Sequence, residues 1–199
     1  MKKVVIASNN AHKVEEIKTA LDFGGWEFYT LSDLGVVSDP DEDADTFEGN
    51  ARIKARAAYE AAGCAALADD SGIEVDALDG APGVHSARYA GAHASDDENN
   101  EKLLAALEGV PDEKRTGRFV STLVFVDDDG TETVAYGTIE GKIGYAPQGS
   151  EGFGYDPLFY PDQFDGARTL AQVSQAEKNA ISHRGNALRE LKAKLTDKL

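Results

Sequence analysis

The sequence lacks features on which several classes of protein depend. It contains one cysteine, Cys64, in 199 residues, so an intrachain disulfide is impossible and a zinc site built on several thiolates is excluded. No apolar run approaches the roughly 20 residues of a membrane-spanning helix. The apolar stretch after the first two lysines is too short for a secretory signal peptide. We therefore expect a cytoplasmic protein with no membrane partner.

Basic residues are also scarce. Lys and Arg number 20 against 36 Asp and Glu, which gives a formal net charge of −16. An extended DNA- or RNA-binding face is normally basic, so this balance argues against a nucleic-acid polymer as partner. It leaves room for a small pocket in which a few lysines bind one nucleotide. The length and the 41% of hydrophobic residues predict a single domain over residues 1–199, with two lobes.

The hydrophobic pattern alternates between strands and helices, which is typical of an α/β fold. Asp45, with Glu48 three residues later, is expected to cap the second helix, and Gly63 to end it. The acidic turn at residues 127–130 is expected to join two long strands as a hairpin. The predicted strands span residues 4–7, 26–31, 65–68, 117–126 and 132–140, residues 73–75 are expected to be extended as well, and the predicted helices span 11–22, 46–62, 96–108 and 181–197.

Two segments carry residues suited to phosphate. The loop Ser8–Lys13 lies between the first strand and the first helix, where backbone N–H groups are unpaired and attract anions. Asn10 adds an amide there and Lys13 a positive charge. Lys54 lies four residues after Asn50, on the same helix face, and could reach a phosphate. The alternatives are an ordinary helix cap and a surface lysine.

A pair of carboxylates follows the predicted strand 65–68. Asp69 and Asp70 point in opposite directions on extended backbone, so we expect one of them to face a ligand. Ligands of open α/β sheets bind beyond the carboxyl ends of the strands. A carboxylate there suits Mg²⁺, which binds through one or two carboxylates and substrate phosphates. Glu42, in the acidic segment 38–48, could supply the second ligand. The alternative is a purely structural turn.

An aromatic loop and a group of donors suit a nucleobase. Phe153 and Tyr155 lie beside glycines in the segment Gly152–Asp156, which offers a flat face for stacking. Lys178 and the run Ser182-His183-Arg184 place three donors near a predicted helix start. Taken alone, His183 would more often be a structural histidine.

Five stretches together resemble one family, the pyrophosphatases of noncanonical purine nucleoside triphosphates (the ITP/XTP pyrophosphatase family). The resemblance spans nearly the whole chain. It implies an α/β fold with an elongated mixed sheet in two lobes, flanked by helices, and a nucleotide cleft between the lobes. It also implies a homodimer and Mg²⁺-dependent hydrolysis of ITP, dITP and XTP to the monophosphate and pyrophosphate. The stretches are ASNNAHK (7–13), TFEGNA with Lys54 (46–54), ADDSGIEVDALDGAPGVHSARYAG (68–91), GFGYDPLFY (152–160) and EKNAISHRGNAL (177–188).

The resemblance also assigns roles to residues. It implies that Asp70 is the proton acceptor and a Mg²⁺ ligand, and that Glu42 is a second metal-associated carboxylate. Asn9 departs from the family pattern, because many members have glycine at that place. The substrate-binding residues that it implies are Ser8, Asn9, Asn10, Ala11, His12, Lys13, Lys54, Ser71, Phe153, Gly154, Tyr155, Asp156, Lys178, His183 and Arg184.

Two alternative functions stay open at this point. One is a nucleotide pyrophosphatase of the same fold that acts on modified pyrimidine or ordinary deoxynucleoside triphosphates. The other is a nucleotide sensor without catalytic activity. The sequence does not separate a role of Asp70 as metal ligand from a role in orienting the attacking water.

Overall fold

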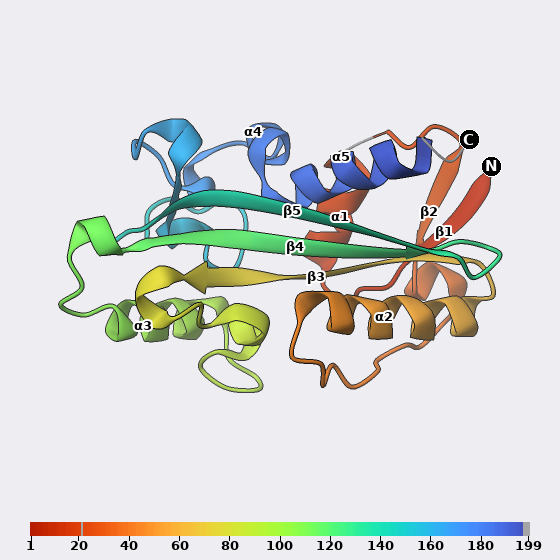
Figure 1. Ribbon diagram of the computed structural model, residues 1–199, viewed down its shortest axis with the longest axis horizontal. Helices are drawn as coiled ribbons and strands as arrows, with labels where there is room; N and C mark the ends of the chain where they lie inside the picture. The colour runs from red at the N-terminus through yellow and green to blue at the C-terminus, as the bar shows by residue number, and fades with distance from the viewer. Residues whose placement is uncertain (21, 197–199) are drawn as a thin grey trace. The chain divides into compact units, whose positions relative to one another are not determined.

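The computed structural model of the protein describes residues 1–20 and 22–196 (Figure 1). The chain forms two compact units. Unit 1 comprises Met1–Asp70, Ser121–Gly137 and the segment from Arg184 onward, and unit 2 comprises Ser71–Val120 and Thr138–His183. The strands are β1 (Lys2–Ile6), β2 (Trp26–Thr30), β3 (Ala65–Val75), β4 (Thr116–Val126), β5 (Glu132–Ile143) and β6 (Phe159–Pro161). The helices are α1 (Ala11–Ala20), α2 (Phe47–Ala62), α3 (Asp96–Ala106), α4 (Gln175–Ile181) and α5 (His183–Thr196).

The strands pair in the order β2-β1-β3-β4-β5-β6. β1 runs parallel to both β2 and β3, whereas β5 and β6 are antiparallel. The sheet is therefore mixed, and helices flank it, which confirms the predicted fold class. The turn between β4 and β5 closes through a bond from Gly130 N to Asp127 O of 2.8 Å, as the acidic run with its glycine predicted.

Unit 1 is a three-layer arrangement that follows from the period-two pattern of its strands. In β3, Ala65 and Leu67 face a core made with α1 and α5, while Ala66 and Ala68 face a core made with α2. Figure 1 shows α2 and α5 on opposite sides of these strands. Consecutive residues of β3 therefore point to different helices. The carboxylates of Asp69 and Asp70, which come next in the strand, accordingly face opposite sides of the sheet.

Unit 2 has its own hydrophobic core. Ile73 and Val75, at the far end of β3, pack with Leu103 and Leu107 of the α3 segment and with Phe159 of β6. The loop that precedes β6 contributes Tyr155 and Leu158 to the same core. The aromatic loop singled out in the sequence is thus fastened to a packed core.

Three sequence predictions are corrected by the structure. The strand predicted over 65–68 and the extended residues 73–75 form one continuous strand, so Asp69 and Asp70 lie within β3 and not at the end of a strand. The helix predicted over 181–197 begins two residues later, as α5 at His183, because Ser182 has an extended backbone and ends a separate, unpredicted helix, α4. The cap of α2 is Thr46, whose Oγ1 accepts a bond from Gly49 N at 3.0 Å, and not Asp45. Gly63 ends α2 in the left-handed conformation, as predicted. Positions 21 and 197 of the predicted helices lie outside the described residues.

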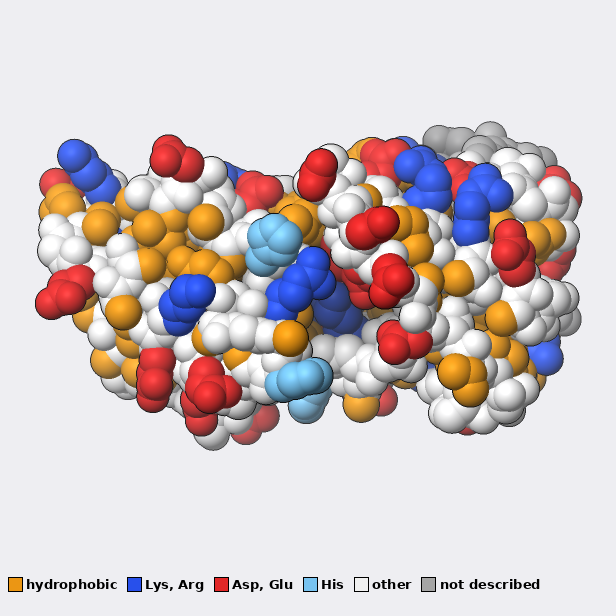
Figure 2. Space-filling model, turned by 90° about the horizontal axis from the view of Figure 1, so that it is seen from below, with side chains coloured by type: hydrophobic (Ala, Val, Ile, Leu, Met, Phe, Trp, Pro, Cys, Tyr) orange, Lys and Arg blue, Asp and Glu red, His pale blue; other side chains and the backbone are white. Residues whose placement is uncertain are grey.

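The surface reflects the acidic composition. Figure 2 shows one face of the protein, over which Asp and Glu side chains are spread and not gathered into one patch. Within residues 1–20 and 22–196, no helix combines the length and apolar character that crossing a membrane requires.

Candidate functional site

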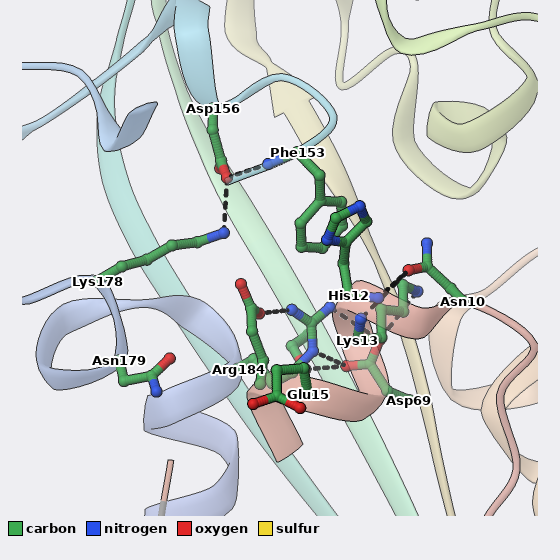
Figure 3. Close-up of polar contacts among 12 residues, drawn as sticks. Asn10, His12, Lys13, Glu15, Asp69, Phe153, Asp156, Lys178, Asn179 and Arg184 are labelled. Carbon is green, nitrogen blue, oxygen red and sulfur yellow. Dashed lines mark hydrogen bonds and ion pairs between the residues drawn. The ribbon is translucent and has the colours of Figure 1, made fainter. Parts of the chain in front are cut away.

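The loop between β1 and α1 is ordered by its own side chains. Asn10 Oδ1 accepts bonds from the backbone N–H groups of His12 at 3.0 Å and Lys13 at 3.2 Å, so Asn10 caps α1 (Figure 3). Ser8 Oγ accepts a bond from Asn10 N at 3.1 Å. The cap fixes the first turn of the helix and with it the direction in which the Lys13 side chain leaves. Whether these residues also bind substrate stays a prediction.

Asn9 needs no special backbone conformation. The described non-glycine residues with positive φ are Asp79 and Asp165, so Asn9 does not adopt the left-handed conformation that favours glycine. Its side-chain amide donates to Ser38 O at 3.4 Å, at the start of the acidic segment. A cavity of about 510 Å³ in unit 1 is lined by the predicted substrate-binding residues Ser8, Asn9 and Ala11 together with residues 30–32 and 36–39. This volume is within the range of small-ligand sites.

Asp69 lies at the centre of a buried charge cluster in unit 1. Its carboxylate is bound by Arg184 at 3.1 Å (Nη2–Oδ1) and by Lys13 at 3.0 Å (Nζ–Oδ1), as Figure 3 shows. Ser121 Oγ of β4 donates to its Oδ2 at 2.6 Å. Burial alone would raise the pKa of the Asp69 carboxyl, but Arg184 and Lys13 hold it well below its usual range. Asp69 is therefore ionised and committed to its partners.

Arg184 joins the same cluster from the first turn of α5. Its side chain is 1% exposed and binds Glu16 of α1 as well as Asp69. These two carboxylates raise the pKa of Arg184 even though burial opposes the charge. Sequence analysis grouped Arg184 with Lys178 and His183 as donors for a base. The structure gives its guanidinium two carboxylate partners in the charge cluster of unit 1, and its role in binding the base stays a prediction.

Asp70 points to the opposite side of β3, toward α2. Lys54 Nζ of α2 lies 3.1 Å from Asp70 Oδ1 and 2.8 Å from Glu42 Oε2, so one ammonium joins the two carboxylates that were predicted as metal ligands. Asp70 Oδ2 is buried and has no hydrogen-bond partner among the described residues. Burial raises the pKa of the Asp70 carboxyl despite the nearby Lys54. Asp70 and Glu42 outweigh the effect of burial on Lys54 and raise its pKa, which keeps it charged.

The acidic segment that carries Glu42 is held by α2. Asn50 is buried and its Oδ1 accepts a bond from Ala44 N at 3.0 Å. Asn50 was noted in the sequence for sharing a helix face with Lys54. In the structure it fixes the segment so that Glu42 meets Lys54.

The donor set Asp70 and Glu42 fits a magnesium ion. Both are hard oxygen ligands, and the unpartnered Asp70 Oδ2 leaves a buried carboxylate oxygen for a cation. The described part of the chain contains no group of three or more His, Cys, Asp or Glu arranged around one metal position. Two carboxylates suffice for Mg²⁺, because it retains several waters and takes further oxygens from substrate phosphates.

Unit 2 contains the second set of predicted residues. Lys178 Nζ lies 2.6 Å from Asp156 Oδ2, and both side chains are 3% exposed. The same oxygen accepts a bond from Phe153 N at 3.0 Å, and the Lys178 ammonium lies 4.6 Å from the centroid of the Phe153 ring. Figure 3 shows these three residues side by side. The aromatic loop and the lysine, far apart in sequence, thus form one group.

Further contacts hold the other predicted residues of unit 2. Tyr155 OH donates to Ser86 O at 2.7 Å, and burial raises the pKa of Tyr155, so it stays neutral. The His183 ring stacks on Phe119 with centroids 4.8 Å apart, which fixes its plane. Ser71 follows Asp70 within β3 and is partly buried.

The partners in the charge cluster were not predicted from the sequence. It favoured Asp70 and gave no role to Asp69, Glu16 or Ser121, which the structure places together. A usable signal was the run Lys13–Ile17 on α1. Glu16 lies beside the buried Ile17, and an acidic residue near a buried helix position indicates a cationic partner.

The mixed sheet brings partly buried lysines beside the buried carboxylates of Asp69 and Asp70, and such a site suits a phosphorylated ligand and a hard cation. The comparisons with known proteins agree with this class. A model of the Ham1 family matches residues 4–194, and the chain belongs to that family.

Among its relatives, the chain is 50% identical over 198 residues to the dITP/XTP pyrophosphatase of Corynebacterium glutamicum, covering 97% of this chain and 96% of that protein. It is 47% identical over 201 residues to the dITP/XTP pyrophosphatase of Clostridium perfringens, covering 98% of each. Among solved structures, it is similar to a HAM1 protein from Coxiella burnetii, with a TM-score of 0.87 and 41% identity over 99% of this chain and 100% of that one.

Proposed function

We propose that the protein hydrolyses noncanonical purine nucleoside triphosphates, namely ITP, dITP and XTP, to the monophosphate and pyrophosphate, and so removes deaminated purines from the nucleotide pool. One observation carries the proposal. Asp70, a buried carboxylate with an unpartnered oxygen, lies against a lysine that also binds Glu42. The names of the dITP/XTP pyrophosphatases at 47–50% identity over nearly the whole chain support the choice of substrate.

Unit 1 handles the triphosphate. Asp70 and Glu42 would hold Mg²⁺, which supplies stabilisation of negative charge on the phosphate oxygens. Asp70 also orients the attacking water or accepts its proton. Lys13 and Lys54 neutralise phosphate oxygens as charge builds on the leaving pyrophosphate. The N-terminal turn of α1, with Ser8 to Lys13, binds further oxygens.

The buried cluster around Asp69 holds Lys13 in position for this role. Lys13 leaves the first turn of α1, and Asp69 holds its ammonium in place. Arg184 and Glu16 fix the Asp69 carboxylate from the other side. A preorganised lysine stabilises developing charge without rearranging at the moment of reaction.

Unit 2 recognises the base. Phe153 offers its ring for stacking, and the neighbouring Lys178 and His183 supply donors. Hypoxanthine and xanthine carry an acceptor oxygen at position 6, where adenine carries a donor amino group. A donor placed there pairs with the deaminated purines and opposes adenine, and an unpaired buried polar group can discriminate by up to about 10⁴-fold.

The protein acts in the cytoplasm as a homodimer, and residues 1–199 work as one pyrophosphatase domain. The homodimer rests on the family resemblance, the cytoplasm on the single cysteine and the lack of long apolar runs, and the single domain on the length. Analytical ultracentrifugation of the purified protein tests the dimer, and a monomer at micromolar concentration would contradict it.

A panel of substrates tests the proposed activity. Pyrophosphate release is measured with ITP, XTP, dTTP and GTP, with and without Mg²⁺. The proposal predicts high kcat/KM for ITP and XTP, low values for the other two, and loss of activity with a chelator. High activity on dTTP would favour a pyrimidine pyrophosphatase, and binding without hydrolysis would favour a sensor. Either result would overturn the proposal.

A further inference from the structure

One residue of the aromatic loop has both of its backbone polar groups bound by a single helix. Gly154 N donates to Asp96 Oδ2 at 2.7 Å, and Asn100 Nδ2 donates to Gly154 O at 3.0 Å. Asp96 and Asn100 are four residues apart on α3, so they lie on the same helix face. All of these residues belong to unit 2. The Asp96 carboxylate therefore accepts from the backbone N–H of Gly154, and the Asn100 amide donates to the carbonyl of the same residue.

The pair is itself held firmly. Ser95 caps α3 and forms a capping box with Glu98, which fixes the turn that carries Asp96. Asn99 binds Ala90 N at 2.8 Å through its Oδ1, which fastens the next turn to another loop. A rigid helix end can impose a position on a loop, whereas a frayed one cannot.

The loop needs an outside constraint because glycines flank Phe153. Gly152 has φ +71° and Gly154 has φ +62°, and glycine has more backbone freedom than any other residue. An added Cβ at Gly152 would lie 2.1 Å from Asp156 Oδ2, so glycine is required there. Because glycine cannot restrict its own backbone, the loop needs contacts from outside it. The Asp96–Asn100 pair supplies two such contacts.

Asn100 is not the choice that stability alone would favour. The residue is 4% exposed and its Oδ1 has no hydrogen-bond partner among the described residues. An unsatisfied buried acceptor destabilises the fold, and an apolar side chain of similar size would avoid that penalty. The Asn100 amide is useful because its Nδ2 donates a hydrogen bond to Gly154 O.

We infer that Asp96 and Asn100 are positioning residues for base recognition: they fix Gly154, and through it the Phe153 ring and the Asp156–Lys178 pair, in the arrangement that binds a deaminated purine. The inference rests on the proposed function. Preorganising a binding loop lowers the entropy lost when the ligand binds. The pair acts on the base and leaves the triphosphate site of unit 1 untouched.

Variants of the pair separate these roles. Asp96→Ala removes the acceptor at an exposed position, and Asn100→Leu removes the donor. The matched control is Asp97→Ala, which removes the same charge from the first turn of α3 at an exposed residue without a contact to the loop. One hydrogen bond is worth about 0.5–1.5 kcal/mol, so each pair variant should raise the KM for dITP by about two- to tenfold with little change in kcat.

Two further readouts exclude a general structural effect. Inorganic tripolyphosphate carries the phosphates without a base, so its Ki as a competitor of dITP should be the same in the pair variants as in the wild type, because unit 1 is unchanged. Amide hydrogen exchange at Gly154, followed by NMR, should speed up in Asp96→Ala and not in Asp97→Ala. Asp96 is exposed, so its variant gives an answer even if Asn100→Leu does not fold.

The outcomes divide cleanly. A higher KM for dITP, an unchanged Ki for tripolyphosphate and faster exchange at Gly154 support the inference. Faster exchange with an unchanged KM would overturn it, because the pair would then hold the loop without affecting recognition. A parallel loss of dITP and tripolyphosphate binding would also overturn it. A wild-type protein that releases no pyrophosphate from dITP would instead refute the proposed function on which the inference depends.

Discussion

Exchanging each of the adjacent Asp69 and Asp70 for asparagine tests whether one carboxylate is structural and the other, as proposed, catalytic. Asp69→Asn removes the charge between Arg184 and Lys13 in a site that is almost fully buried. Breaking a buried ion pair by removing one partner costs about 3–5 kcal/mol. Glu16 still binds Arg184 in the variant, so we expect the lower end, about 3 kcal/mol. For a protein of this size that corresponds to a fall in Tm of about 6–12 °C.

Asp70→Asn should behave in the opposite way. Burial already disfavours the ionised form of this carboxyl, and Lys54 keeps Glu42 as a partner when Asp70 is neutral. The free energy of unfolding should stay within about 1 kcal/mol of the wild type. The kcat for dITP should fall by at least about 10²-fold, because the metal site loses a ligand charge.

Urea unfolding and steady-state kinetics on both variants check the contrast. The wild type and Asp156→Asn serve as references, since Asp156 belongs to a buried ion pair of unit 2. Equal loss of stability in Asp69→Asn and Asp70→Asn would refute the division of labour between the two faces of β3. Near wild-type turnover in Asp70→Asn would refute the assignment of the catalytic carboxylate.

Three further predictions follow from particular contacts. Lys54→Met leaves two carboxylates without their shared cation, so its Tm should be lower than that of the wild type without Mg²⁺ and should rise more when Mg²⁺ is added; equal responses would contradict the role of Lys54. Tyr155→Phe loses a buried hydrogen bond and should cost about 1 kcal/mol of unfolding free energy near neutral pH. Because the folded pKa of Tyr155 is raised, the wild type loses this advantage as the pH rises above about 10, and a gap that stays constant there in urea titrations would be inconsistent. Gly152→Ala places a Cβ against Asp156 Oδ2 at a positive φ, so it should raise the KM for dITP while leaving the Ki of tripolyphosphate unchanged.

Much of the fold could be predicted from local features of the sequence. The helix after β1 starts at an asparagine that caps it, and α2 ends at Gly63, because caps and left-handed glycines act within a few residues. The alternation of Leu67 and Ala68 likewise assigns the faces of β3 from neighbouring positions alone. Such features are visible in a single sequence.

The errors came from partners far apart in the chain. Two consecutive aspartates look like a turn, and the predicted strand therefore stopped at Ala68. In the structure β3 continues through both aspartates. This is possible because Arg184, which lies 115 positions away in the sequence, neutralises the Asp69 carboxylate. Burial of a charge depends on such a partner. No local pattern identified Arg184 as the cation that makes the burial of Asp69 possible.

The candidate site shows the same division. The sequence predicted residues for phosphate and for base, which stay predictions, and it singled out Lys54, which the structure places against Asp70 and Glu42. The attachment of the aromatic loop to Asp96 and Asn100 was not, since these residues look like an ordinary polar helix start. Their role becomes visible only in the structure, where the two side chains on α3 bind the backbone N–H and carbonyl of Gly154.

The central claim is that water cleaves the triphosphate so that pyrophosphate leaves, and the position of the cut tests it most directly. The wild type is incubated with dITP and Mg²⁺ in water labelled with oxygen-18, and the products are separated and weighed by mass spectrometry. Attack at the α-phosphorus predicts dIMP that carries one labelled oxygen, together with unlabelled pyrophosphate. Release of orthophosphate with dIDP, or label in the pyrophosphate, would contradict the account.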